Sequence, residues 1–242
     1  MELPAAIPLV IGVTGHRDLV EDEVPAIREQ VRTYLSGLRA RWPATPLIVA
    51  SQLAEGADLL VAEEAQALGL ELVFLLPLPL DDYRAQFSDG AALQRFEALR
   101  GVSRVVDLAT DPPPHDRDAL YELAGDFLAR YSFILLALWD GKPAASPGGT
   151  AAVVNFRFAS RGGARPATAE LRDIALGEAD NSLVYHILVS RARVNGGPTN
   201  GHRPLTAGYL HEYAGGRSAL QDAMPESRRR VLDRTDEFNR VA

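Results

Sequence analysis

The sequence contains two glycine-containing runs whose residue types suit binding of a phosphate group. The first, GVTGHRD at residues 12–18, directly follows an apolar stretch. The side chains of Thr14, His16 and Arg17 can each donate a hydrogen bond to an anion, and Gly15 lets a ligand approach the backbone closely. Small and polar residues after a buried strand are typical of the sheet edge where α/β proteins bind ligands. We therefore predict a phosphate or nucleotide site here.

The second run, PGGT, lies far downstream and also follows an apolar stretch. A glycine pair at the start of a helix lets successive backbone N–H groups surround an oxyanion, so we predict Gly148, Gly149 and Thr150 at the same site. The preceding stretch ends in Trp139 and Asp140. We place both at this site as well, although a tryptophan at a strand end often serves packing. Together the two loops predict one composite pocket.

A third loop, between an apolar stretch and a helical pattern, supplies further candidates. Ser51 and Glu55 can bind a ribose hydroxyl, while Gly56 and Ala57 open a helix whose N-terminus faces the same edge of the sheet. Asp58 either contacts the ligand or simply favours the helix dipole as a residue of the first turn. Both interpretations of Asp58 stay open.

A fourth loop begins at Pro77, which would make it rigid. Tyr83 or Phe87 beyond it can stack on a nucleobase. Aromatic residues at helical spacing also commonly belong to a core, so the alternative of simple packing stays open for both rings.

Other kinds of site are disfavoured. The chain has no cysteine, and its five histidines lack the short spacing of metal ligands. It contains none of the patterns GxSxG, GxGxxG or GxxxxGK[ST], which disfavours a serine hydrolase, a dinucleotide dehydrogenase and a P-loop NTPase. We expect no metal and no required cofactor, and a nucleotide-derived molecule as the ligand.

Length and composition indicate a globular protein. The 242 residues can bury a sizeable core, and 47% hydrophobic with 24% charged residues is ordinary for such a chain. The net charge of −7 disfavours nonspecific binding to DNA or to an acidic membrane. The start of the chain lacks the features of a signal peptide, and no apolar run is long enough to span a bilayer, so we expect a cytoplasmic protein.

Apolar runs alternate with segments of helical spacing, which predicts an α/β fold: a Rossmann-like, doubly wound, mostly parallel sheet covered on both faces, with a C-terminal strand and helix extension. The predicted strands cover residues 9–14, 47–50, 70–76, 102–107, 133–138 and 183–189. The predicted helices cover residues 24–42, 56–68, 81–100 (one short and one longer helix), 116–131 and 225–242.

Glycine- and proline-rich segments become frequent towards the end of the chain. We therefore predict a nucleotide-binding domain at residues 1–190 and a loop-rich extension at residues 191–242 that ends in a charged helix.

The order of the motifs resembles the SLOG superfamily, a Rossmann-like group. It includes the Lonely Guy phosphoribohydrolases, the DNA-processing protein DprA and the nucleotide-sensing modules of bacterial conflict systems and TRPM channels. The resemblance rests on GxxGHR at residues 12–17, on AEGAD at 54–58, on the PLP run at 77–79 and on PGGT at 147–150, and it covers roughly residues 7–158. It implies a sensor for a phosphorylated nucleoside, NAD-derived or cyclic, that switches a fused or separate effector, in bacterial defence for example, and that forms a homo-oligomer.

One departure bears on the chemistry. Lonely Guy enzymes carry a catalytic glutamate soon after their glycine run, whereas here Thr150 is followed by AAVVN. The alternative to a sensor is a phosphoribohydrolase that cleaves a nucleotide N-glycosidic bond, for which Glu55 and Asp140 are the candidate carboxylates. DprA-like binding of single-stranded DNA needs a basic groove with stacking aromatics, so we do not expect DNA as a partner.

Overall fold

The computed structural model describes residues 6–108, 117–143, 149–159, 183–192, 205–214 and 217–242. These residues build one central sheet with the strand order β4-β3-β2-β1-β5-β6-β7-β8. The first six strands of the chain are mutually parallel, β7 runs antiparallel to β6, and β8 runs antiparallel to β7. The strands are β1 (Leu9–Gly15), β2 (Leu47–Ser51), β3 (Glu71–Leu76), β4 (Arg104–Asp107), β5 (Ile134–Trp139), β6 (Val184–Leu188), β7 (Ala207–Ala214) and β8 (Arg217–Gln221).

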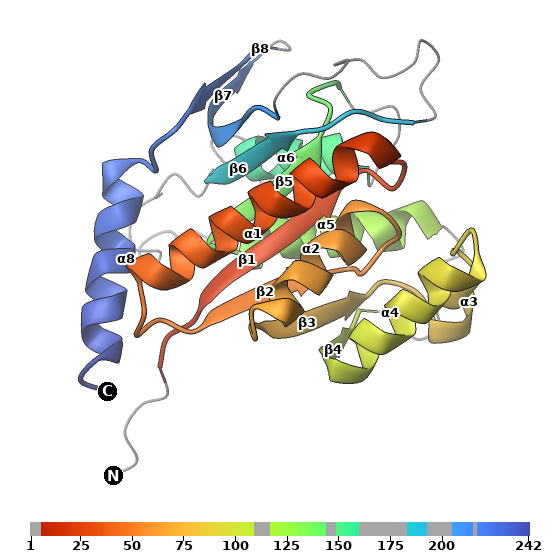
Figure 1. Ribbon diagram of the computed structural model, residues 1–242, viewed down its shortest axis with the longest axis horizontal. Helices are drawn as coiled ribbons and strands as arrows, with labels where there is room; N and C mark the ends of the chain where they lie inside the picture. The colour runs from red at the N-terminus through yellow and green to blue at the C-terminus, as the bar shows by residue number, and fades with distance from the viewer. Residues whose placement is uncertain (1–5, 109–116, 144–148, 160–182, 193–204, 215–216) are drawn as a thin grey trace, which may run out of the picture.

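Helices cover both faces of this sheet (Figure 1). The front face in that view carries α1 (Val24–Arg41), α2 (Ala57–Ala67) and α4 (Gly90–Val102), with the short η1 (Glu21–Glu23) and α3 (Leu80–Arg84) at its loops. The back face carries α5 (Arg117–Tyr131) and α6 (Thr150–Ala159). From β1 to β4 each new strand is added on one side of β1, whereas β5 and the later strands are added on the other side. Because the crossovers between parallel strands are right-handed, the helices of these two halves cover opposite faces of the sheet. The fold is the predicted Rossmann-like, doubly wound one.

The parallel strands are buried because helices shield them from both sides. Every residue of β2 and of β5 is buried, which explains their unbroken apolar sequences. The edge strand β4 is the exception, since it is mostly exposed. It is also shorter than the predicted strand at 102–107, because α4 continues through Val102 before the chain turns at Ser103.

The last part of the chain holds two strands that the sequence analysis did not predict. Where a loop-rich extension was expected, β7 pairs with β6 and β8 pairs with β7, so the sheet continues beyond residue 190. The predicted charged helix is present as α8 (Glu226–Asn239). Within the described ranges, no helix is long and apolar enough to cross a membrane.

Helix α8 lies at the amino ends of the parallel strands, on the left of Figure 1. Leu232 is buried against the main core. Asp236 accepts hydrogen bonds from the backbone N–H of Ala44 at 2.8 Å and from the hydroxyl of Thr45 at 3.1 Å, just before β2. The helix is therefore anchored at the end of the sheet opposite the predicted site.

Candidate functional site

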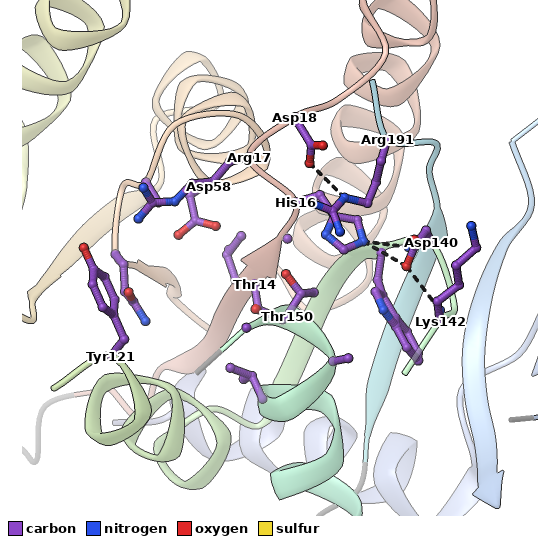
Figure 2. A pocket seen from close by; sticks show the side chains of 18 of the residues that line it. Thr14, His16, Arg17, Asp18, Asp58, Tyr121, Asp140, Lys142, Thr150 and Arg191 are labelled. Carbon is purple, nitrogen blue, oxygen red and sulfur yellow. Dashed lines mark hydrogen bonds and ion pairs between the residues drawn. The ribbon is translucent and has the colours of Figure 1, made fainter. Parts of the chain in front are cut away.

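A cavity of about 500 Å³ opens at the carboxyl ends of β1 and β5 (Figure 2); we call it the rim cavity. Figure 2 shows Thr14 and Thr150 at its base, Arg17, Asp58 and Tyr121 on one side, and the remaining labelled side chains on the other. The connections leaving β1 and β5 run in opposite directions here, which is where open α/β sheets bind ligands.

The first loop is held by close packing at Gly15. The backbone N–H of His16 donates to the carbonyl of Leu138 on β5 at 3.0 Å. A Cβ atom on Gly15 would lie 2.3 Å from the Cβ of Ala57, so only glycine fits between β1 and the start of α2. This contact explains why the strand ends in a glycine at this level.

The loop after β2 packs against the loop after β1. Gly56 has φ of +86°, and a Cβ there would lie 2.3 Å from the carbonyl oxygen of Arg17. The N–H of Ala57 donates to the carbonyl of His16 at 3.0 Å. Gly56 and Ala57 thus position the loop that carries Arg17, and neither lines the rim cavity.

Asp58 lines the rim cavity from the first turn of α2. Its carboxylate accepts a hydrogen bond from the hydroxyl of Ser51 at 2.8 Å, and that hydroxyl accepts one from the N–H of Leu53 at 2.9 Å. Burial raises the pKa of Asp58 to about 6, although the Ser51 hydrogen bond and the charge of Arg17 oppose the shift. Ser51 thus acts through Asp58 and does not itself line the cavity.

His16 and Asp140 form the opposite side. The Nε2 atom of His16 accepts a hydrogen bond from the N–H of Asp140 at 3.1 Å and lies 3.0 Å from its Oδ1. Burial lowers the pKa of His16, and Asp140 only partly offsets this. The N–H of Lys142 donates to the same carboxylate at 3.2 Å. Asp140 therefore fixes the loop after β5 and the ring of His16.

Arg191 joins this side from the end of β6. Its Nε donates to Oδ1 of Asp18 at 2.9 Å. Next to it, the hydroxyl and the N–H of Ser190 donate to the carboxylate of Glu23 at 2.6 and 2.8 Å. These contacts tie the loop after β1 to the segment that follows β6. They therefore hold the backbone that carries His16, Arg17 and Arg191 in place.

Arg17 is exposed and lies over the ring of Tyr121, with its Cζ 5.8 Å from the ring centroid. Tyr121 comes from α5, on the other face of the sheet from α2. This pair gives the rim cavity a flat aromatic surface beside a guanidinium.

The structure brings together part of the predicted set. The predicted residues that line the rim cavity are Thr14, Gly15, His16, Arg17, Asp58, Trp139, Asp140, Gly149 and Thr150. Those that do not line it are Ser51, Glu55, Gly56, Ala57, Pro77 and Tyr83, and Gly148 lies outside the described residues.

Three of the residues outside the cavity have other partners or surroundings. The carboxylate of Glu55 accepts hydrogen bonds from the hydroxyl and the N–H of Ser88. Tyr83 packs in the core and donates its hydroxyl to the carbonyl of Gln52 at 2.7 Å, so it does not stack on a ligand in the rim cavity. Pro77 is buried.

Several residues that line the cavity were not among the predicted site residues: Asp18, Gln52, Ala54, Tyr121, Lys142 and Arg191. Gln52 and Ala54 lie inside a loop that the motifs had already marked. Tyr121 has the spacing of a core residue, and Arg191 follows the last predicted strand. Neither of these two carries a local signal. No group of three or more histidine and acidic side chains in the described ranges could hold a metal ion.

No protein-family model matches the chain, and no curated protein sequence matches it. Two solved structures of DNA processing protein A are similar to part of it. The Streptococcus pneumoniae protein is 17% identical, covers 54% of this chain and 41% of its own, and has a TM-score of 0.39. The Helicobacter pylori protein, described for its single-stranded DNA binding mode, is 12% identical, with 63% and 61% covered and a TM-score of 0.45. This chain spans less than two thirds of either protein.

Proposed function

We propose that the chain binds a phosphorylated nucleoside in the rim cavity. The observation that carries this proposal is the convergence of Thr14, Arg17 and the N-terminus of α6 on one cavity of about 500 Å³. The first backbone N–H groups of a helix have no partner within it, and they favour an anion together with a hydroxyl and a guanidinium. The volume falls within the range of about 300–1,000 Å³ that is common for small-molecule sites.

The other side chains of the cavity suit the nucleoside part. The ring of Tyr121 offers a surface for a base, next to the guanidinium of Arg17. Asp58 and Gln52 line the same side and can bind ribose hydroxyl groups through their side-chain oxygens. We place the base and sugar at this side, and the phosphate between the guanidinium of Arg17 and the N-terminus of α6 at Gly149 and Thr150.

A sensor fits these residues better than a hydrolase. Of the two candidate carboxylates, Glu55 is engaged by Ser88 outside the cavity and Asp140 is engaged by the Lys142 N–H beside His16. A ligand that bridges the loops after β1 and β5 would favour one arrangement of them and could so switch a second copy of the chain or an effector, by its higher affinity for that arrangement.

Thermal shift and calorimetry with adenosine monophosphate, cyclic adenosine monophosphate, ADP-ribose and a single-stranded oligonucleotide test the proposal. We expect saturable binding of at least one nucleotide, no release of free base on chromatography, and weaker binding of the oligonucleotide. Release of base would favour the hydrolase instead. No stabilisation by any nucleotide at millimolar concentration would contradict the proposal, because a ligand at 100 times its Kd stabilises by about 2.7 kcal/mol.

Replacing Arg17 by Gln should weaken nucleotide binding by at least about tenfold, since a hydrogen bond to a charged group contributes about 1.5–3 kcal/mol. The matched control is Arg234→Gln, which removes the same charge from the exposed face of α8, away from the rim cavity. Equal affinity of the Arg17 variant and the parent in calorimetry would show that the phosphate lies elsewhere.

A further inference from the structure

A second cavity, of about 420 Å³, lies on the front face of the sheet; we call it the tyrosine cavity. It is formed by α1 from Gln30 to its end, by β6 and β7, and by residues 222–229, which lead into the start of α8. These elements lie together at the left and centre of Figure 1, towards the amino ends of the parallel strands. It shares no lining residue with the rim cavity. Nothing in the proposed function uses it.

The wall of this cavity is a rigid cluster of three tyrosines. The rings of Tyr34 and Tyr185 stack with centroids 3.6 Å apart and planes 13° apart, and Tyr209 meets Tyr185 edge-on at 5.1 Å. The hydroxyls of Tyr34 and Tyr209 lie 3.3 Å apart, and the amide of Gln30 donates to the hydroxyl of Tyr185 at 3.2 Å. A wall already held in place costs little ordering when a flat molecule packs against it.

Two arginines from different elements stand at this wall: Arg41 from α1 and Arg229 from α8, both exposed. Within the described part of the chain neither guanidinium has a carboxylate partner, although the protein is acidic overall and Arg230, next along α8, pairs with Glu226 at 2.5 Å. Asp222 also lines the cavity, so the charged side chains there leave a local excess of one positive charge. That excess favours a ligand with an acidic group.

Gly37 supplies an independent observation. It lies inside α1, where glycine is a poor helix former, and a Cβ atom there would meet no described atom within 4 Å. Packing among the described residues therefore does not require glycine at this position. Because Gly37 lines the tyrosine cavity, its missing side chain leaves room for a ligand against the helix backbone.

We propose that the tyrosine cavity binds a small aromatic anion, a flat ring carrying one carboxylate or phosphate group. The ring lies against Tyr34, Tyr185 and Tyr209, and the acidic group lies between Arg41 and Arg229. Guanidinium groups recognise carboxylate and phosphate through the same paired hydrogen bonds, so both anions belong to this class.

The two tryptophans of the chain give each cavity its own reporter, because Trp42 lines the tyrosine cavity and Trp139 lines the rim cavity. In the Trp139→Phe variant, 4-hydroxyphenylacetate or phenyl phosphate should change the fluorescence of Trp42 in a saturable way, whereas inorganic phosphate should not. If 4-hydroxyphenylacetate binds more tightly than phenyl phosphate, the acidic group of the ligand is a carboxylate; if phenyl phosphate binds more tightly, it is a phosphate. Nucleotide binding is followed separately through Trp139 in the Trp42→Phe variant, so either site can fail without the other.

Arg41→Gln and Arg229→Gln should each weaken binding of the aromatic anion by at least about fivefold, while Arg234→Gln on the same helix should change it less than about twofold. Gly37→Leu fills the open space and should abolish binding while leaving the thermal midpoint unchanged or higher, which separates blocking from unfolding. Thermal shift of the unmodified chain provides a second readout. The proposal is overturned if neither aromatic anion binds at millimolar concentration, if Arg234→Gln weakens binding as much as Arg41→Gln, or if Gly37→Leu binds like the parent.

Discussion

Asp58 belongs both to the framework of the site and to the cavity. Its carboxylate is 5% exposed and holds the Ser51 hydroxyl, which in turn holds the N–H of Leu53, a leucine with φ of +53°. The same carboxylate lines the rim cavity beside Arg17. A buried carboxylate of this kind lowers the stability of the fold at neutral pH, because its charged form is costly to bury.

Replacing Asp58 by Asn should therefore stabilise the protein at high pH. The pKa of Asp58 is about 6 in the folded state, against an ordinary value of 3.8. Between pH 3.8 and about 6 the folded state therefore binds more protons than the unfolded state, so the stability of the parent falls as the pH rises through this range. The asparagine side chain carries no charge, and its amide oxygen can still accept the hydrogen bond from Ser51. The variant should gain up to about 3 kcal/mol at pH 8 and little at pH 4.

Urea unfolding at pH 4 and at pH 8 measures this gain. The control is Asp22→Asn, an exposed carboxylate in the short helix before α1, which should show no such pH-dependent gain. A loss of stability in the Asp58 variant at pH 8 would mean that its hydrogen bonds outweigh the burial of its charge.

Among the elements, α8 and the loops at the rim have opposite roles. The rim loops are held by contacts between the segments that follow β1 and β6, of which Arg191 with Asp18 and Ser190 with Glu23 are examples. Helix α8 anchors the other end of the sheet through Asp236, which is 1% exposed. Burial alone would raise the pKa of Asp236, but its hydrogen bonds from Ala44, Thr45 and Arg240 outweigh this and lower it.

Replacing Asp236 by Ala should cost about 1–3 kcal/mol in the free energy of unfolding, because Ala44 and Thr45 lose a buried charged acceptor. Nucleotide affinity should stay within about twofold, since α8 lies at the end of the sheet away from the rim cavity. The matched control is Glu237→Ala, an exposed carboxylate on the same helix. If nucleotide affinity fell in step with stability, the two ends of the sheet would be coupled.

At the scale of the whole molecule, the sheet does not stop at residue 190. β6 is buried and pairs with β7, and Leu232 of α8 belongs to the same core cluster as Ile11 of β1. Division of the chain into a domain at 1–190 and an extension at 191–242 stays a prediction. These contacts favour one cooperative unit over that division.

Ending the chain at residue 190 should therefore abolish cooperative folding, whereas the full chain should unfold in a single transition. Removal of β7 and α8 exposes apolar side chains of β6 and of the core, for example Ile187 and Tyr185. Urea unfolding followed by circular dichroism and by tryptophan fluorescence tests both statements. A shortened chain with its own cooperative transition would support the predicted domain boundary instead.

Much of the fold could be predicted from local sequence. Apolar runs without alternation indicated buried parallel strands, and the glycine-containing run at their ends marked the edge of the sheet where the cavity lies. The strands β7 and β8 could not be recognised in the same way, since they follow glycine-rich loops.

The sequence by itself determined the sheet, its helices and the loops that meet at the rim, because these depend on periodicity and on backbone conformation, both of which are local. The tertiary structure alone decided which side chains face the cavity. Tyr83 and Glu55 turn to partners in the core and at Ser88, while Tyr121 and Arg191 arrive from a distant helix and strand. The direction of a side chain depends on neighbours far away in the chain, and spacing along the sequence does not encode them.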